Sequence, residues 1–174
     1  MTQLFMTHPA PLSSVGQSAI ADGLELRSAT IDDAAEIAGV LAESFEENWD
    51  AARVVREFFD AADVVNTWVV SDPAGIVGTA SERLMPEVYK DAGYVHYVGV
   101  LRRARGRRVG AILTERCIRG FAERGLATAV LETDDFRIPA LITYFRLGFI
   151  PTYRTAEEQG AWSRLLPRLF GAAA

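Results

Sequence analysis

The stretch YVHYVGVLRRARGRRVGA, residues 94–111, decides the fold of this chain. Aromatic and β-branched residues dominate its first part and predict a strand. A basic loop follows around Gly106, and Gly110 lies where the next helix begins. The arginines of this loop are Arg102, Arg103, Arg105, Arg107 and Arg108. Because the first N–H groups of a helix lack acceptors within it and lie at the positive end of its dipole, the stretch predicts an anion site suited to a phosphate.

Spacing distinguishes this loop from two common phosphate sites. A P-loop needs G-x-x-x-x-G-K-[ST], but the chain has no Gly-Lys pair, and the dinucleotide pattern G-x-G-x-x-G is absent as well. The loop instead resembles the R-x-x-G-x-G/A signature of the GNAT N-acetyltransferase superfamily, with Arg105 opening it and Gly110 closing it. Arg108 replaces the usual middle glycine, and Arg102 replaces a usual proline. Arg108 can still offer its backbone N–H to the anion if its φ is negative, so we expect the phosphate site to persist in a bulkier form.

A second stretch resembles the same family. Residues 144–149 read Y-x-x-L-G-F, which is similar to a GNAT signature whose tyrosine faces the thioester sulfur. The resemblance implies that role for Tyr144. Arg137 stands seven residues earlier, where the family usually has an asparagine that contacts the cofactor. The resemblance covers roughly residues 24–155 and is strongest over residues 94–150.

The resemblance implies a fold, a co-substrate and a set of binding residues. The fold class is α/β, an α+β mixed sheet with splayed parallel strands flanked by helices, as in GNAT acyl-CoA N-acyltransferases. The co-substrate is acetyl-CoA, and no metal is expected. Its pantetheine arm would pair with the backbone of residues 98–100, and its pyrophosphate would lie on the helix start. The expected cofactor-binding residues are Val98, Gly99, Val100, Arg105, Gly106, Arg107, Arg108, Val109, Gly110, Ala111 and Arg137.

The rest of the chain fits one mixed domain over residues 23–174, after a lead over residues 1–22 that we expect to be flexible. Strands are predicted near residues 24–27, 66–71, 75–84, 94–100, 127–131 and from 149, and helices near 31–45, 50–62, 109–124, 140–147 and 156–174. A right-handed crossover should join the fourth and fifth of these strands in parallel. The apolar face of the last helix can dock on the domain core or on a second subunit in a homodimer, and the sequence leaves both open.

Charge is unevenly distributed. Residues 1–100 carry sixteen acidic and five basic side chains, whereas residues 101–124 carry eight arginines against two glutamates. A single basic site in an acidic body favours a small polyanionic ligand and a cationic second substrate, and it argues against nucleic acid, which needs a broad basic face. Cys117 is the only cysteine and excludes an internal disulfide, and no apolar run reaches membrane-spanning length. We therefore expect a cytoplasmic protein that binds neither nucleic acid nor membrane.

Acetyl transfer to a primary amine places negative charge first on a carbonyl oxygen and then on a thiolate. A backbone N–H in the strand around Gly99 is expected to stabilise the first charge. Tyr144 is the predicted proton donor to the second, because a phenol with a pKa near ~10 can protonate a leaving thiolate. A purely packing role for Tyr144 stays open.

The amine must also lose a proton, and His96 is the predicted base because its imidazole titrates near neutrality. Strand alternation without a bulge would place His96 on the face that carries Tyr94, Val98 and Val100. We expect acidic neighbours such as Glu132 to favour its charged form. Tyr94 and Glu132 remain alternative bases, and a structural role for His96 stays open.

The sequence thus predicts an acyltransferase that moves an acetyl group from acetyl-CoA to a primary amine of a small molecule or peptide by direct attack. Two other classes stay open. One is a catalytically idle GNAT module that binds acyl-CoA as a sensor or interaction protein. The other is an anion-binding domain that recognises a nucleotide or nucleic-acid phosphate without acyl transfer. The sequence does not name the acceptor.

Overall fold

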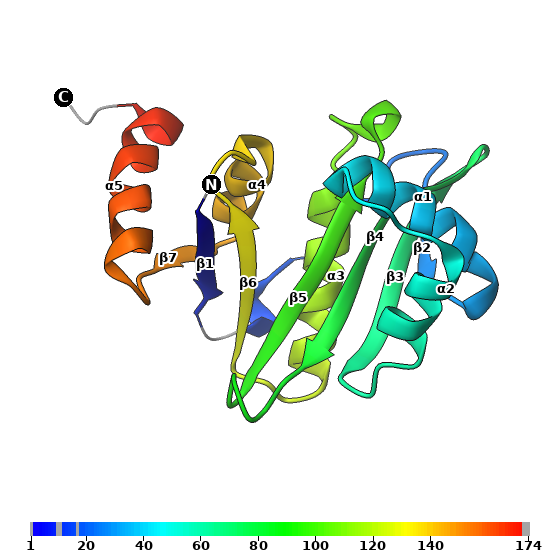
Figure 1. Ribbon diagram of the computed structural model, residues 1–174, viewed down its shortest axis with the longest axis horizontal. Coiled ribbons are helices and arrows are strands. Elements are labelled where there is room, and N and C mark those ends of the chain that lie inside the picture. The colour runs from blue at the N-terminus through cyan, green and yellow to red at the C-terminus, as the bar shows by residue number, and fades with distance from the viewer. Residues whose placement is uncertain (1, 10–11, 17, 172–174) are drawn as a thin grey trace.

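The computed structural model describes residues 2–9, 12–16 and 18–171 (Figure 1). Within them, seven strands form one sheet in the order β2-β3-β4-β5-β6-β1-β7. The strands are β1 (Gln3–His8), β2 (Glu25–Ser28), β3 (Val64–Asp72), β4 (Gly75–Leu84), β5 (Ala92–Val100), β6 (Thr128–Asp134) and β7 (Ile150–Thr152). The helices are α1 (Ala34–Phe45), α2 (Ala51–Val54), α3 (Val109–Glu123), α4 (Ile138–Arg146) and α5 (Ala156–Phe170). Four short helical segments are η1 (Leu12–Ser14), η2 (Ile31–Asp33), η3 (Val55–Phe59, a π-helix) and η4 (Arg102–Ala104).

The sheet is mixed and has helices on both faces, which confirms the predicted fold class. β5 and β6 run parallel, and the other neighbouring strands run antiparallel. Figure 1 shows α1 and α2 in front of the sheet and α3 behind it. Ile37 and Leu41 of α1 belong to the front core, whereas Phe121 of α3 and Trp162 of α5 belong to the rear core, and each of these side chains is fully buried. The last helix therefore docks on the domain core.

Two further expectations concern assembly and membranes. The homodimer stays a prediction, because a single chain does not test it. Among the helices of the described residues, none combines the length and the apolar character that crossing a bilayer requires.

The first strand corrects the expectation of a flexible lead over residues 1–22. β1 lies inside the sheet, where it pairs antiparallel with both β6 and β7. Leu4 and Met6 are fully buried in the rear core, and Phe5 is buried on the other face of the strand. The expectation is wrong for this segment because two neighbouring strands satisfy its backbone, a long-range effect that its short sequence pattern does not reveal.

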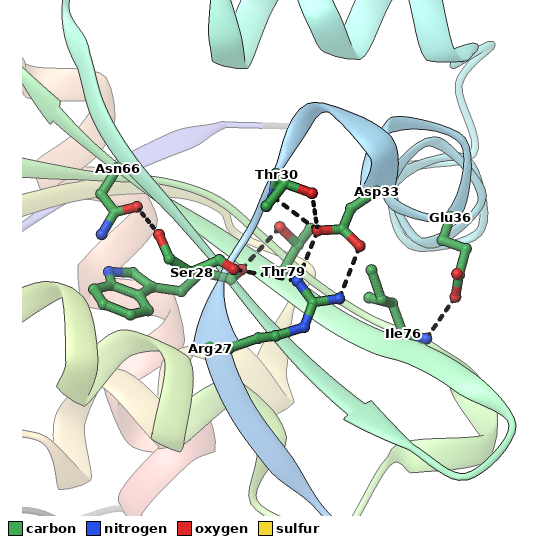
Figure 2. A network of polar contacts seen from close by, with 9 residues as sticks. Arg27, Ser28, Thr30, Asp33, Glu36, Asn66, Ile76 and Thr79 are labelled. Carbon is green, nitrogen blue, oxygen red and sulfur yellow. Dashed lines mark hydrogen bonds and ion pairs between the residues drawn. The ribbon is translucent and has the colours of Figure 1, made fainter.

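The first turn of α1 is fixed by a network of polar contacts (Figure 2). Arg27 of β2 donates to both carboxylate oxygens of Asp33, at 2.7 and 2.8 Å, and the Thr30 N–H donates to the same carboxylate at 2.8 Å. The Arg27 hydrogen bond lowers the pKa of Asp33 to about 2, against the opposing effect of burial. One turn later, Glu36 accepts the Ile76 N–H at 2.7 Å. These bonds hold α1 against β2 and against the β3–β4 hairpin.

The central strand β5 changes character at a bulge. Its first residues pair with β6, from Ala92 opposite Thr128 to Val95 opposite Leu131. The pairing with β4 shifts register at the same level, and Tyr97 has a φ of 47°, in the left-handed region. Beyond this point β5 and β6 diverge, as the upper half of Figure 1 shows. The parallel strands are therefore splayed, as the resemblance implied.

Candidate functional site

The splay leaves one edge of β5 without a strand partner over residues 97–100. The Leu101 N–H donates to the Val77 carbonyl of β4 at 2.9 Å. Because successive residues of a strand point their N–H groups to opposite edges, the N–H groups of Val98 and Val100 point to the open edge. The Val100 N–H donates to the Ser44 hydroxyl of α1 at 3.0 Å. The edge expected to receive the pantetheine arm therefore exists and is touched by α1.

Gly99 allows α1 to approach this closely. A Cβ atom on Gly99 would lie 3.2 Å from the Ser44 hydroxyl and 3.3 Å from a Val40 methyl, so a side chain would press on α1. The glycine is therefore explained by the close approach of a helix, whereas the bulge itself lies at Tyr97.

The open edge leads into the basic loop and the start of α3. The first hydrogen bond into the helix runs from the Ile112 N–H to the Arg108 carbonyl at 3.0 Å, so the N–H groups just before Ile112 have no acceptor within the helix. Gly106 has a φ of 79° and Arg108 a φ of 62°. The condition of a negative φ at Arg108 is therefore not met. The signature places a glycine here because the turn needs the left-handed region, and Arg108 adopts it at a cost of about 1 kcal/mol.

The arginines of the loop are held mainly by other parts of the chain. Arg103 and Arg107 both donate to Asp72 of the β3–β4 hairpin, at 2.5 and 3.3 Å. The Arg103 hydrogen bond is the main cause that lowers the pKa of Asp72. Arg108 donates to the Ser18 hydroxyl at 2.9 Å. Arg105 is exposed, and within the described residues its side chain makes no hydrogen bond or ion pair. Its guanidinium can therefore meet a ligand without breaking another contact.

Tyr144 lies on α4, behind the diverging end of the sheet, and is 6% exposed. Burial raises the pKa of its phenol to about 12. Its ring packs against Phe149 at a centroid distance of 5.9 Å. The phenol therefore keeps its proton at neutral pH, as a proton donor must.

Arg137 joins two segments that border the open edge. It donates to Asp134, at the end of β6, at 2.8 Å and to the Ser44 carbonyl of α1 at 3.1 Å. Its guanidinium carbon lies 4.7 Å from the centre of the Phe45 ring. These contacts give Arg137 a structural role beside the open edge, and its contact with a cofactor stays a prediction.

His96 occupies a different environment from the one expected. The bulge puts Tyr97 on the same face as His96, with ring centres 4.0 Å apart, while Val98 and Val100 pack into the rear core. The expectation that His96 shares a face with these two valines is therefore wrong, because it assumed an unbroken alternation. The ring of Tyr94 does lie on the His96 face, at 5.5 Å.

The electrostatic surroundings of His96 also differ from the expectation. Its Nε2 atom lies 3.4 Å from an Arg83 nitrogen, which can only donate, so the neutral ring must carry its proton on Nδ1. Nδ1 is buried without a partner among the described residues. Burial and the charge of Arg83 lower the pKa of His96 to about 3. The acidic neighbour that favours the charged form of His96 is Asp63 and not Glu132. Its effect on the pKa is smaller than the effects of burial and of Arg83.

A carboxylate stands on the same front face, next to β1. Glu132 of β6 accepts from the Tyr94 hydroxyl at 3.2 Å and from Arg154 at 2.6 Å. Tyr89 stacks on Tyr94 with ring centres 5.6 Å apart, and the Arg154 guanidinium lies 4.2 Å above the centre of the Phe5 ring. We call these five residues the aromatic patch. Sequence reasoning identified Tyr94 and Glu132 but missed the other three. Phe5 of β1 and Arg154 after β7 reach this site only through tertiary structure, whereas Tyr89 lies in the loop just before β5.

Metal ligands do not gather at this site. Within the described residues, no group of three or more His, Cys, Asp or Glu side chains is placed to hold a metal ion. The expectation of chemistry without a metal stays a prediction.

Comparison with known proteins places this geometry among acetyltransferases. Residues 34–149 match the acetyltransferase (GNAT) family. Mycothiol acetyltransferase of Nocardia farcinica is 29% identical over 103 residues, which cover 59% of this chain and 34% of that protein. The chain spans about a third to a half of the length of the curated relatives that it matches.

Solved structures show the same fold. A GNAT-family structure from Novosphingobium aromaticivorans aligns with a TM-score of 0.66 at 22% identity, covering 86% of this chain and 59% of that one. A transcriptional regulator from Bacillus halodurans aligns with a TM-score of 0.66 at 23% identity, covering 76% and 96%. At these identities the likeness concerns the fold and not the substrate.

Proposed function

The chain belongs to the acetyltransferase (GNAT) family, and on this premise we propose that it transfers an acetyl group from acetyl-CoA to a primary amine. One observation carries the proposal: the open edge of β5 continues through residues 101–108 to the N–H groups at the start of α3. A strand edge binds amides and a helix start binds phosphate, so this run suits an arm with amides and a pyrophosphate. Bound there, acetyl-CoA would supply an acetyl group activated as a thioester.

Two groups of the chain support the transfer itself. The Val98 N–H points to the open edge and can donate a hydrogen bond to a carbonyl oxygen that gains negative charge. Tyr144 keeps its proton at neutral pH and can donate a hydrogen bond to the leaving thiolate. Because a thiol has a lower pKa, near ~8.5, transfer of the proton is uphill and is completed only when the phenol regains a proton from water. Both roles need positioning more than strong acidity.

We assign removal of the amine proton to Glu132 in place of His96. A histidine with a pKa of about 3 holds a proton poorly, and its Nε2 atom already faces an Arg83 nitrogen at 3.4 Å. Glu132 is held by Tyr94 and Arg154 on the same front face. Its carboxylate can attract an ammonium group and accept the proton directly or through water.

The acceptor is proposed to be a small molecule that carries a primary amine. The curated relatives are named for mycothiol acetylation, which supports a small-molecule substrate. The aromatic patch supports an amine, because aromatic faces beside a carboxylate favour a cation. A soluble, cytoplasmic setting remains part of this proposal.

The test combines ligand binding with turnover. A thermal-shift series with acetyl-CoA, CoA, ATP and an oligonucleotide should show selective stabilisation by the two CoA ligands, about 2.7 kcal/mol at a hundredfold excess over Kd. Thiol release with a panel of amines then reports transfer. Binding without turnover on any amine would favour the idle acyl-CoA module, and selective binding of ATP or oligonucleotide would refute the proposal.

Gly110 offers a matched pair of variants. A Cβ atom there would lie 3.6 Å from a Val100 methyl, an ordinary contact, so Gly110→Ala should fold and bind. Gly110→Asp should fold equally well but lose CoA binding, because its carboxylate brings negative charge to the phosphate site. Unchanged CoA affinity in a folded Gly110→Asp protein would contradict the assignment.

A further inference from the structure

Ser44 accepts a hydrogen bond from a backbone N–H of β5 that the proposed function needs for ligand binding. The Val100 N–H points to the open edge of β5 and donates to the Ser44 hydroxyl at 3.0 Å. On an interior strand this N–H would donate to a carbonyl of the next strand, but β6 has already diverged at this level. The Ser44 hydroxyl thus accepts the hydrogen bond from the Val100 N–H. A carbonyl of a neighbouring strand, or an amide carbonyl of a ligand, would otherwise accept it.

The last turn of α1 is attached to both sides of this edge. The Arg102 N–H, at the start of the basic loop, donates to Glu43 at 2.5 Å. Arg137, in the segment after β6, donates to the Ser44 carbonyl at 3.1 Å. Glu46 follows as the C-cap in the left-handed region, with a φ of 56°. The end of α1 therefore contacts the loops that border the open edge, and it leads directly to Trp49 before α2.

We propose that Ser44 is a positioning residue that holds the Val100 N–H in the free protein and releases it to an amide carbonyl of the pantetheine arm. The proposal rests on the function proposed above. A partly buried N–H without a partner is costly, so the hydroxyl keeps this strand edge ordered until the ligand arrives. A serine hydroxyl turns about one bond and can give up the N–H without moving the helix axis. When the ligand takes the Val100 N–H, the Ser44 hydroxyl loses this hydrogen bond. Cofactor binding then changes a contact at the end of α1, next to the segment that carries Trp49.

The proposal separates two parts of CoA. Adenosine 3′,5′-bisphosphate has the base, the 3′-phosphate and the first 5′-phosphate of CoA but lacks the pantetheine arm, so its binding should not depend on Ser44. CoA must displace the hydroxyl. Ser44→Ala removes that competition, and we expect CoA affinity to rise about threefold to tenfold while bisphosphate affinity stays unchanged. Ser163→Ala is the matched control, because that hydroxyl bonds to the Gln159 carbonyl on α5, outside the site.

Amide hydrogen exchange at Val100 gives a second readout that a purely structural serine would not produce. In the free protein, Ser44→Ala should accelerate exchange of the Val100 N–H. With CoA bound, wild type and variant should be equally protected, because the ligand then holds the N–H in both.

Two results would overturn the proposal. In the first, the Ser44→Ala substitution leaves the ratio of CoA affinity to bisphosphate affinity unchanged or lowers it. The other is a Val100 N–H that stays unprotected in the CoA complex of the variant. If wild type binds neither ligand, the proposed function fails as well, whereas normal CoA binding with either result refutes the role of Ser44 alone.

Discussion

The two halves of β5 differ in what lies at their edges. Residues 92–95 pair with β4 on one side and β6 on the other, whereas residues 97–100 have β4 on one side and an open edge on the other. The backbone groups of the first half are used by the fold, and those of the second half are left for α1 or a ligand. The change occurs at Tyr97, where the strand adopts a left-handed φ. One bulge thus divides a segment paired on both edges from a segment with one open edge.

The largest expected effect concerns the chemistry assigned to the open half. Tyr144→Phe keeps the ring that packs against Phe149 and removes only the phenol proton. If this proton neutralises the leaving thiolate, turnover should fall ~10²–10⁴-fold while CoA affinity hardly changes. Steady-state kinetics with binding measured separately checks this. A loss below about threefold would reduce Tyr144 to a packing residue.

Two glycines test the halves directly. A Cβ on Gly93, in the closed half, would lie 2.2 Å from the buried ring of Phe121, so Gly93→Ala should lower the free energy of unfolding by about 3 kcal/mol. Gly99→Ala, in the open half, meets Ser44 and Val40 at 3.2 and 3.3 Å and should cost less than about 1 kcal/mol. Urea unfolding of both variants provides the comparison. Equal losses would mean that the two halves are equally constrained.

A pH titration of unfolding tests the ion pair at the start of α1, the helix whose last turn contacts the open half. The pKa of Asp33 is lowered from 3.8 to about 2, so its pair with Arg27 stabilises the fold above pH 4 and loses that effect as the pH falls toward 2. Because Arg27 is partly exposed, we expect about 1–2 kcal/mol at most. Asp33→Asn should flatten the pH dependence of unfolding in this window. An unchanged pH profile in the variant would show that other carboxylates cause it.

The smallest expected effect concerns the loop beyond the open half. Arg108→Gly restores the usual glycine at a left-handed position and should change stability by less than about 1 kcal/mol, toward the folded state. Calorimetry of CoA binding should show little change, because in the proposed site the backbone at the helix start binds the anion. A tenfold loss of affinity would instead assign the phosphate contact to the Arg108 guanidinium.

Much of the binding surface was predictable because its signals are local. The basic loop, the glycine at the start of α3 and the Tyr144 segment each lie within a few residues, and the structure forms a strand, loop and helix where they indicate. His96 and Arg108 show where such reasoning fails. The side on which His96 lies depends on a register shift against β4, and the φ of Arg108 depends on the turn that joins η4 to α3.

The sequence by itself determined the family, the order of the main elements and the basic loop before α3, since backbone preferences and signature spacing act over short distances. Only the tertiary structure decided that β1 lies inside the sheet, that Ser44 meets the Val100 N–H, and that Arg154 reaches Glu132. Each of these contacts joins residues more than twenty positions apart. Such pairings are selected by the packing and hydrogen bonding of the whole domain, which no local pattern encodes.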